Sequence, residues 1–346
     1  MAMADVTVLG AGIFGLSVAW ACARRGARVR VIDPNGVGAG CSGGLVGALA
    51  PHVPEQWNEK KAFQFESLVI AEGFWGEVEA VSGLSSGYAR LGRIQPVADD
   101  AALDLARARA VSAATLWQGQ AEWQVLRAGE VGDWRPDSPT GWVIRDTLSA
   151  RVHPRQAVAA LAAALRGSGV RIVAEHPPEG RVIHATGGAG LEAVSAALGR
   201  GFGNGVKGQA ALLALDRRDA PQLFVDAVHV VPHGDGTVAI GSTSEREYDD
   251  PASTDSGLDR LIARARAAVP ALRDAPVIAR WAGLRPRARS RAPVLGAHPL
   301  FPAQFIANGG FKIGFGMAPK VGQVMADLVL EGRDGIPEGF RPESCF

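Results

Sequence analysis

The chain has 346 residues, enough for one large core or two intertwined domains. Its 47% apolar content is typical of a globular protein, and 36 Lys and Arg against 35 Asp and Glu leave a net charge of +1. This balance argues against a global attraction to nucleic acid or to an anionic membrane.

The three cysteines, Cys22, Cys41 and Cys345, are odd in number and fit no zinc-binding spacing. Such usage indicates a reducing compartment. No stretch approaches the roughly 18 to 20 uninterrupted apolar residues of a membrane span. We therefore expect a cytoplasmic protein with no membrane span and no metal site.

Residues 5–33 predict a nucleotide-binding unit. The apolar run at 6–9 predicts a buried strand, three glycines follow it, and an apolar helix is expected to run to about Arg25. A second strand, 27–32, ends in Asp33. A strand, a glycine turn, a helix and a parallel strand ending in a carboxylate form the dinucleotide fingerprint. By itself the motif does not distinguish FAD from NAD.

The rest of the chain alternates helical and strand patterns. A glycine-rich loop at 36–44 is expected to lie flat against a planar ligand, and residues 124–142 are expected to be irregular. Helices are predicted over 59–81, 101–120, 154–167, 256–272 and 319–331, and strands over 92–97, 170–174, 182–185, 210–215, 223–232, 237–241, 277–284 and 305–307.

Four segments carry a resemblance when taken in order: GAGIFG (10–15) with Asp33, CSGGLVGALAP (41–51), HATGG (184–188), and WAGLRPRARSRAPVLG (281–296) followed by NGGFKIG (308–314). Together they resemble the FAD-dependent D-amino acid oxidase superfamily, especially glycine oxidase, the thiamine-pathway amino acid oxidases and their sarcosine oxidase relatives. The likeness implies an α/β fold with a glutathione-reductase-type, Rossmann-like FAD-binding domain. It also implies a second, α+β substrate domain on a mixed or antiparallel sheet.

Both domains are expected to be discontinuous. The FAD-binding domain would comprise 1–90, 150–207 and 290–346, and the substrate domain 91–149 and 208–289. The resemblance assigns FAD contacts to Gly10, Ala11, Gly12, Ile13, Phe14, Gly15, Asp33, Pro34, Ser42, Gly43, Gly44, Leu45, Thr186, Gly187, Gly309, Gly310, Phe311, Lys312 and Ile313. Sarcosine oxidase relatives attach flavin through a cysteine in the region matching 285–295. This chain has none there, so the resemblance implies non-covalent FAD.

Three residues are candidates for the catalytic site. Arg285 matches the family arginine that pairs with the substrate carboxylate, a task suited to a planar guanidinium. Lys312 falls where glycine oxidase has a second arginine. His229 stands where glycine oxidase has an active-site tyrosine, so it either contacts substrate or is structural.

A further departure is the arginine-rich stretch that follows Pro286. If extended, it would project Arg285, Arg287, Arg289 and Arg291 to one side, toward an anionic substrate or toward carboxylates such as Asp249 and Asp250. We expect the carboxylate pairing for all of them except Arg285. This arginine-rich stretch and the histidine at position 229 both depart from the glycine oxidase pattern, and they make glycine itself doubtful as the substrate.

The resemblance implies oxidation of the C–N bond of a small amino acid or N-substituted glycine. Hydride transfer to flavin N5 would give an imine and then an oxo acid plus amine or ammonia. Oxygen, yielding peroxide, or another acceptor would take the electrons. We expect a small-molecule substrate and no nucleic-acid partner.

Three alternatives stay open. The first is the flavin domain that completes modified tRNA wobble uridine, favoured by the arginines at 280–291. The second is a dehydrogenase, either NAD-dependent or acting on a 2-hydroxy acid on the same fold. The third is a non-catalytic subunit of a flavin complex, suggested by His229 and Ser290.

Overall fold

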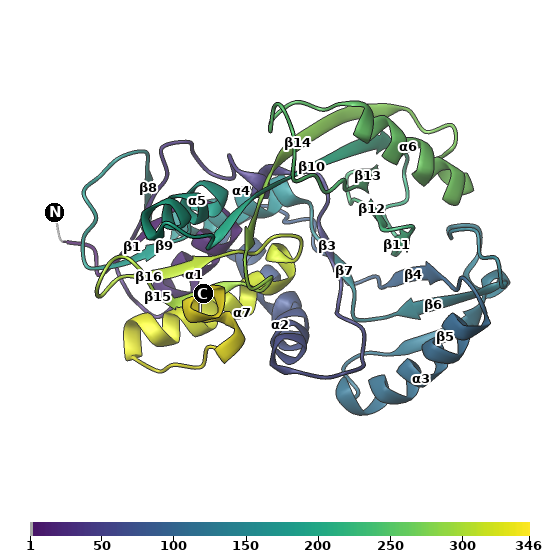
Figure 1. Ribbon diagram of the computed structural model, residues 1–346, viewed down its shortest axis with the longest axis horizontal. Coiled ribbons are helices and arrows are strands. Elements are labelled where there is room, and N and C mark those ends of the chain that lie inside the picture. Colours follow the sequence, from purple (N-terminus) through teal and green to yellow (C-terminus); the bar gives the residue numbers. More distant parts are fainter. Residues whose placement is uncertain (1–2) are drawn as a thin grey trace.

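A computed structural model describes residues 3–346, and its organising element is a six-stranded sheet in the order β15-β16-β9-β1-β2-β8 (Figure 1). All its described pairs are parallel except β15 with β16. The apolar β1 lies at its centre because both faces are covered, and Val6 and Val8 are fully buried. The strands are β1 (Val6–Leu9), β2 (Val29–Ile32), β8 (Arg171–Val173), β9 (Arg181–His184), β15 (Val294–Ala297) and β16 (Phe305–Asn308).

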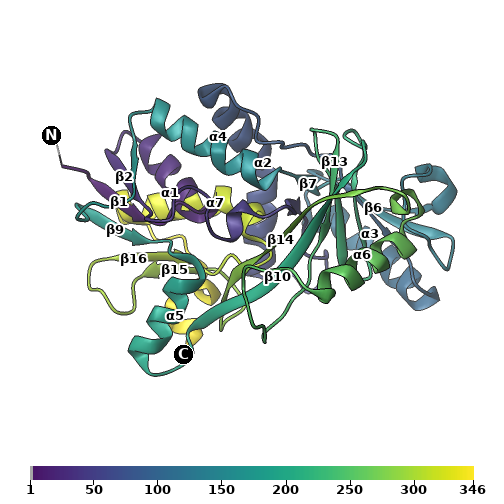
Figure 2. The ribbon, with the colours of Figure 1, turned by 90° about the horizontal axis from the view of Figure 1, so that it is seen from above.

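Helices cover both faces of this sheet (Figure 2). One face packs against a layer of four: α1 (Ile13–Ala23), α2 (Glu59–Ser82), α4 (Pro154–Gly167) and α7 (Gly314–Ala326). The other face packs against α5 (Gly187–Leu198), whose Leu191 and Val194 belong to the same buried cluster as Ile306 of β16.

An eight-stranded sheet forms the second half, in the order β14-β10-β13-β12-β11-β4-β6-β5. Only the pair of β11 with β4 is parallel among its described pairs. One face is closed by α6 (Ser256–Ala268), and α3 (Asp100–Leu116) packs beside β5. The strands are β4 (Arg93–Pro96), β5 (Trp123–Arg127), β6 (Trp142–Asp146), β10 (Gly203–Ala214), β11 (Gln222–Val225), β12 (Val228–Pro232), β13 (Thr237–Gly241) and β14 (Val277–Ala288).

The two halves are joined at three places. The 12-residue strands β10 and β14 pair along their length and run from α5 to the second sheet (Figure 2). A two-stranded sheet joins β3 (Ala48–Leu49) to β7 (Ala150–Arg151). The buried Gln222 of β11 donates from Nε2 to the Ala150 carbonyl at 2.9 Å, which ties the second sheet to β7.

The fold class is confirmed, but several local expectations were wrong. The 124–142 stretch is not irregular throughout, because β5 and the start of β6 pair across it. The expected strand 223–232 is a hairpin whose turn residues, Asp226 and Ala227, adopt positive φ without a glycine to signal it. Helix α5 and strand β15 were not expected, and α7 begins five residues before Pro319.

Among residues 3–346, the longest helices are too polar or too short to cross a bilayer, and no candidate span is found.

Candidate active site

The turn between β1 and α1 has no room for side chains at two of its glycines. Gly10 has φ +111°, and a Cβ there would lie 2.3 Å from the Ala185 carbonyl oxygen. A Cβ on Gly15 would lie 2.0 Å from the Gly10 carbonyl oxygen. The turn therefore holds its backbone close to both β9 and the start of α1, as pyrophosphate binding by a helix N-terminus requires.

Two side chains complete this turn. The Asp33 carboxylate at the end of β2 accepts from the Ala11 N–H at 2.8 Å. The Ser42 hydroxyl accepts from the Ile13 N–H at 3.0 Å, and Ser42 is buried. Helix α1 has no acidic residue in its own first turn, so Asp33 is the carboxylate described at the positive end of its dipole. These features fit the ADP portion of FAD.

The end of the loop at 36–44 packs against β14 of the second sheet. This end forms a short 3-10 helix, Cys41–Gly43, and the Trp281 ring of β14 lies 3.4 Å from where a Gly44 Cβ would be. Leu45 is buried with Trp281 beside it. The small residues at the end of this loop therefore lie against an aromatic ring of β14, and their contact with a planar ligand stays a prediction.

The remaining expected FAD residues meet at the ends of β9 and β16. Helix α5 begins at Gly187, directly after Thr186, and the Asn308 amide donates to the Gly187 carbonyl at 3.0 Å. Gly310 packs close to the Phe14 ring of α1, since its Cβ would lie 3.0 Å from that ring. All four resembling segments therefore converge at the ends of parallel strands, where open α/β sheets bind ligands.

Arg285 is buried on β14 at the border of the two halves, with 7% of its surface exposed. Its guanidinium donates to the Ser242 hydroxyl and to the Thr243 carbonyl, while its Nε has no partner. Burial lowers the pKa of Arg285 to about 10, and Cys41 and Glu245 oppose that shift, so the side chain stays charged at neutral pH. A longer contact, of 3.4 Å, joins the guanidinium to the Lys207 carbonyl, so Arg285 is a buried cation with neutral hydrogen-bond acceptors around it.

Three cationic side chains lie around the Phe311 ring. Its φ is +42°, and its N–H donates to the Pro286 carbonyl at 3.0 Å, which holds the 309–313 loop against β14. The Arg285 Cζ lies 5.4 Å from the ring centroid, the Arg287 Cζ 6.0 Å and the Lys312 Nζ 5.8 Å. Burial, followed by repulsion from Arg285, lowers the pKa of Lys312.

His229 lies on β12. It is paired across the sheet with Phe224, its ring centroid lies 4.6 Å from that of the phenyl ring with the two planes tilted by 46°, and its Nδ1 has no partner. Burial, with repulsion from Arg93 and Lys312, lowers the pKa of His229 to about 3. His229 is therefore a neutral imidazole at physiological pH, and the positive charges that act on it are those of Arg93 and Lys312.

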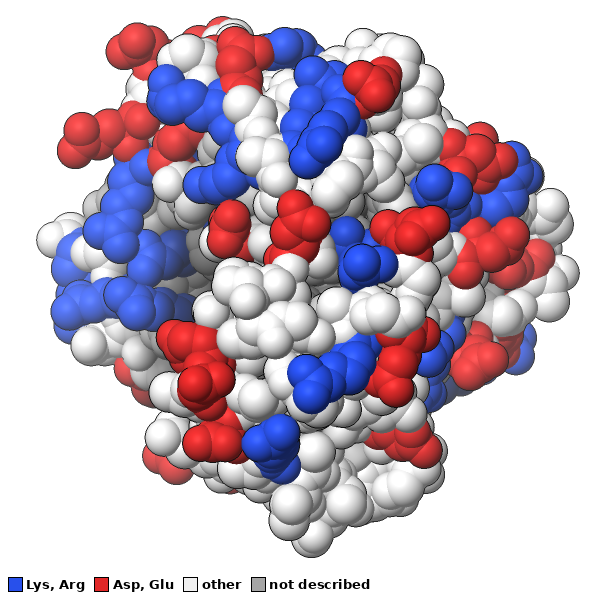
Figure 3. Space-filling model, turned by 90° about the vertical axis from the view of Figure 1, so that its right-hand side faces the viewer, with Lys and Arg blue, Asp and Glu red and all other residues white. Residues whose placement is uncertain are grey.

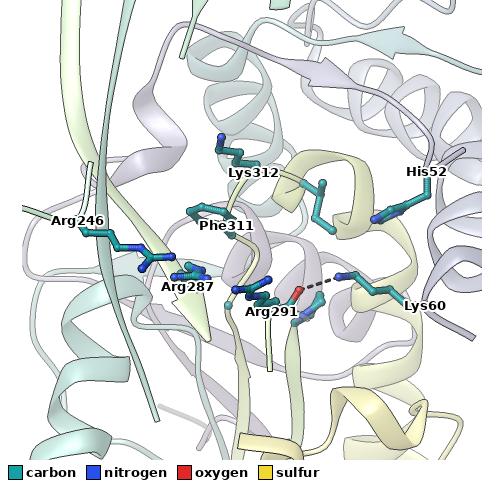
Figure 4. Close-up of a pocket in the computed structure, with 10 residues that line it drawn as sticks. His52, Lys60, Arg246, Arg287, Arg291, Phe311 and Lys312 are labelled. Atoms are coloured by element: carbon teal, nitrogen blue, oxygen red, sulfur yellow. Dashed lines mark hydrogen bonds between the residues drawn. The ribbon is translucent and has the colours of Figure 1, made fainter. Parts of the chain in front are cut away.

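A cavity of about 420 Å³ opens beside Phe311 (Figure 4). Sequence reasoning missed His52, Lys60 and Arg246 among its lining residues, and no local sequence signal marks them, since they come from a loop, the first turn of α2 and another loop. It also expected Arg287 and Arg291 to pair with Asp249 and Asp250. That expectation was wrong: within residues 3–346, neither arginine forms an ion pair. The lining comprises His52, Lys60, Arg246, Arg287, Arg291, Pro293, Gly309, Phe311, Lys312 and Ile313.

The geometry of Arg291 explains part of this difference. Strand β14 ends at Ala288, and Arg291 has φ +59° in the turn that follows, so the stretch is not extended. Arg289 turns away and donates to the Gly201 carbonyl. Arg287 lies at the end of β14 and Arg291 in the turn after it, and both line the same cavity.

Comparison with known proteins agrees with this geometry. The family model described as FAD dependent oxidoreductase matches residues 5–328. Glycine oxidase from Bacillus licheniformis is 26% identical over 94% of this chain and 93% of its own. Among solved structures, glycine oxidase from Geobacillus kaustophilus superposes with a TM-score of 0.83 at 22% identity, covering 98% of each chain.

Iminodiacetate oxidase from Chelativorans sp. BNC1 superposes with a TM-score of 0.84 at 23% identity, covering 97% of this chain and 98% of the other. At these identities the superpositions show the fold alone, whereas the family model spans nearly the whole sequence. The chain therefore belongs to the family of FAD-dependent oxidoreductases, and FAD is its non-covalent cofactor.

Proposed function

We propose that this enzyme oxidises the C–N bond of an amino acid or an N-substituted glycine. The observation that carries the proposal is the buried Arg285, which keeps an unpartnered Nε at the border of the two sheets beside Phe311 and Lys312. The relatives named glycine oxidase and iminodiacetate oxidase act, by their names, on amino acids.

In this proposal the discontinuous domains keep the bounds expected from the sequence. The turn at 10–15, Asp33, Ser42 with the glycines after it, Thr186, Gly187 and the 309–313 loop hold FAD. When bound, FAD supplies the two-electron acceptor for the hydrogen on the carbon next to the substrate nitrogen.

The chain's own residues bind and orient the substrate. Arg285 donates to its carboxylate, and Lys312 adds positive charge on the same side. The neutral His229 neither repels a cationic group nor takes up a proton near pH 7, because its pKa is about 3. Loss of two electrons from the amine leaves an imine, which water converts to an oxo acid and ammonia or an amine.

To test this, the enzyme is mixed anaerobically with amino acids, N-methyl amino acids and 2-hydroxy acids. Reduction of the bound flavin is monitored through the change in flavin absorbance. We expect reduction by at least one amine and none by the matching hydroxy acid. Reduction by a hydroxy acid alone would move the activity to the dehydrogenase alternative. Peroxide formation during aerobic turnover then distinguishes oxygen from another electron acceptor.

The charge distribution bears on the tRNA alternative. The face shown in Figure 3 carries Lys and Arg intermixed with Asp and Glu, with basic side chains gathered along one edge. Arg280 points to the outer side, where it pairs with Asp259 at 2.7 Å. A salt titration of tRNA binding checks this: specific binding at physiological salt would favour the tRNA alternative.

A further inference from the structure

The wall of the cavity beside Phe311 is strongly cationic. Five of its lining side chains are basic, and among the described residues no Asp or Glu lines it; the five are Lys60, Arg246, Arg287, Arg291 and Lys312. They come from α2, from the loop after β13, from the end of β14, from the turn after it and from the loop before α7. Figure 4 shows Arg246, Arg287 and Arg291 in a row below Phe311, with Lys60 beside Arg291 and Lys312 above the ring.

These charges are not compensated inside the protein. Across residues 3–346, carboxylates pair with many other basic side chains but with none of these five. Among the described residues, the Lys60 ammonium has one polar partner, the Arg291 carbonyl, to which it donates at 2.7 Å. A local excess of five positive charges in a chain of net charge +1 therefore has no internal partner.

Repulsion between the basic side chains of this wall lowers the pKa of two of them. Burial, then repulsion from Arg291, lowers the pKa of Lys60. The pKa of Arg287 is lowered by burial and by Arg246 and Arg291. Like charges held together without counter-charges cost free energy that a bound polyanion would recover.

The cationic wall also lies close to the flavin region, so it can contribute to the choice of substrate. Gly309, Phe311 and Ile313 line this cavity and are also expected flavin contacts, so the cavity joins the flavin region to the cationic wall. The carboxylate bound near Arg285 would leave the rest of the substrate on the side of Arg287 and Arg291, because Arg285 and Arg287 flank the same Phe311 ring.

We propose that the substrate is a polyanionic amino acid, with at least one carboxylate or phosphonate besides its α-carboxylate, held by Arg287, Arg291 and Lys60. This inference rests on the proposed function and narrows its substrate class. Glycine and sarcosine would leave the cationic wall without a counter-charge, which gives the departures from glycine oxidase a physical reason.

A pair of ligands that differ by one charge tests the proposal. Iminodiacetate and its monoamide, N-(2-amino-2-oxoethyl)glycine, have nearly the same size, but only iminodiacetate carries a second carboxylate. Kd is measured anaerobically from the change in flavin absorbance, and the reduction rate is measured in the same samples. We expect iminodiacetate to bind about tenfold or more tightly than the monoamide. N-(phosphonomethyl)glycine then shows whether a phosphonate replaces the carboxylate.

Variants locate the effect. Arg287→Gln and Arg291→Gln should each reduce the iminodiacetate-to-monoamide preference several-fold, and the double variant should remove most of it. Arg280→Gln is the matched control: it removes the same charge from the same strand, but from the side that pairs with Asp259. It should leave the preference unchanged. The FAD dissociation constant is measured for every variant.

Three results would overturn the inference: equal binding of iminodiacetate and its monoamide, equal weakening of both ligands in the variants, or an effect confined to FAD affinity. The last would assign the cations to the cofactor. If iminodiacetate binds with the expected dependence on Arg287 and Arg291 but no amine reduces the flavin, the anion site stands and the proposed oxidation fails.

Discussion

In the proposed function, Arg285 serves both structure and binding. Its guanidinium is held by Ser242 and Thr243, so it is already oriented before a substrate arrives. The entropic cost of fixing this long side chain is therefore incurred on folding rather than on binding. Its remaining donor and its full charge are then available to a carboxylate.

Replacing Arg285 with lysine should therefore weaken substrate binding by about ten- to a hundredfold, the usual worth of a hydrogen bond between charged groups. The FAD dissociation constant should change far less. Both are measured by titration of flavin absorbance, with Arg280→Lys as the control. An equal loss of flavin and substrate affinity would contradict the role of carboxylate anchor.

Buried histidines predict how stability depends on pH. His233 is 1% exposed, and burial, with repulsion from His153 and Arg151 and partial relief from Asp235, lowers its pKa from 6.5 to about 3. The unfolded chain therefore binds more protons than the native chain between pH 6.5 and pH 3. Stability falls as the pH falls through that window and is fully retained above it.

For His233 alone the loss at pH 5 is on the order of 2 kcal/mol relative to pH 8. His233→Asn should make the free energy of unfolding, measured with urea in saturating FAD, less dependent on pH between 8 and 5. The difference between variant and parent at pH 8, where the histidine is neutral in both states, reports the packing cost alone. A parent protein whose stability is constant from pH 8 to pH 5 would refute the assignment.

Among the elements, the β1–α1 unit depends most strictly on its glycines. Gly15→Ala would bring a methyl group 2.0 Å from the Gly10 carbonyl oxygen, and neither can rotate away, because the backbone fixes the Cβ position and the carbonyl belongs to the backbone. We expect a loss of about 1–3 kcal/mol in stability, together with weaker FAD binding, because the start of α1 must shift.

Gly76→Ala is the matched control for this prediction. Gly76 lies inside α2 with nothing within 4 Å of its missing Cβ, so alanine should stabilise the helix by about 0.5–1 kcal/mol. Urea unfolding and FAD titration are measured for both variants. Equal behaviour of the two would mean that the close approach at Gly15 is not needed.

For the molecule as a whole, the expected cofactor contacts lie at both ends of the chain. The 10–15 turn and the 309–313 loop meet beside Phe14, almost 300 residues apart in sequence. A ligand that bridges them stabilises the assembled state, by about 2.7 kcal/mol at a concentration one hundred times its Kd.

Thermal unfolding should therefore shift upward when FAD is added to flavin-free protein. Riboflavin, which lacks the ADP portion and cannot occupy the β1–α1 turn, should shift it less. The unfolding temperature is followed by tryptophan fluorescence and circular dichroism with each ligand. No shift with FAD, or an equal shift with riboflavin at the same ligand concentration, would contradict this use of the turn.

The fold class and the choice of FAD came from the family resemblance of four segments taken together, whereas local patterns in the sequence were sufficient for the β1–α1–β2 unit ending in Asp33. That unit depends on short-range chemistry: glycines where the backbone must approach, an apolar run where a strand is buried, and a carboxylate at the strand end. The same resemblance allowed Arg285, Lys312 and His229 to be chosen as candidates.

Only the tertiary structure brought the cationic wall together. Lys60, Arg246 and Arg291 come from an N-terminal helix, a loop after β13 and a turn after β14, and each looks like an ordinary surface cation in its own segment. A site made by strand order and loop packing leaves no local pattern, because its members become neighbours only when both sheets are in place. Sequence determined the cofactor and the kind of chemistry, whereas the assembly of distant segments decided the charge around the substrate.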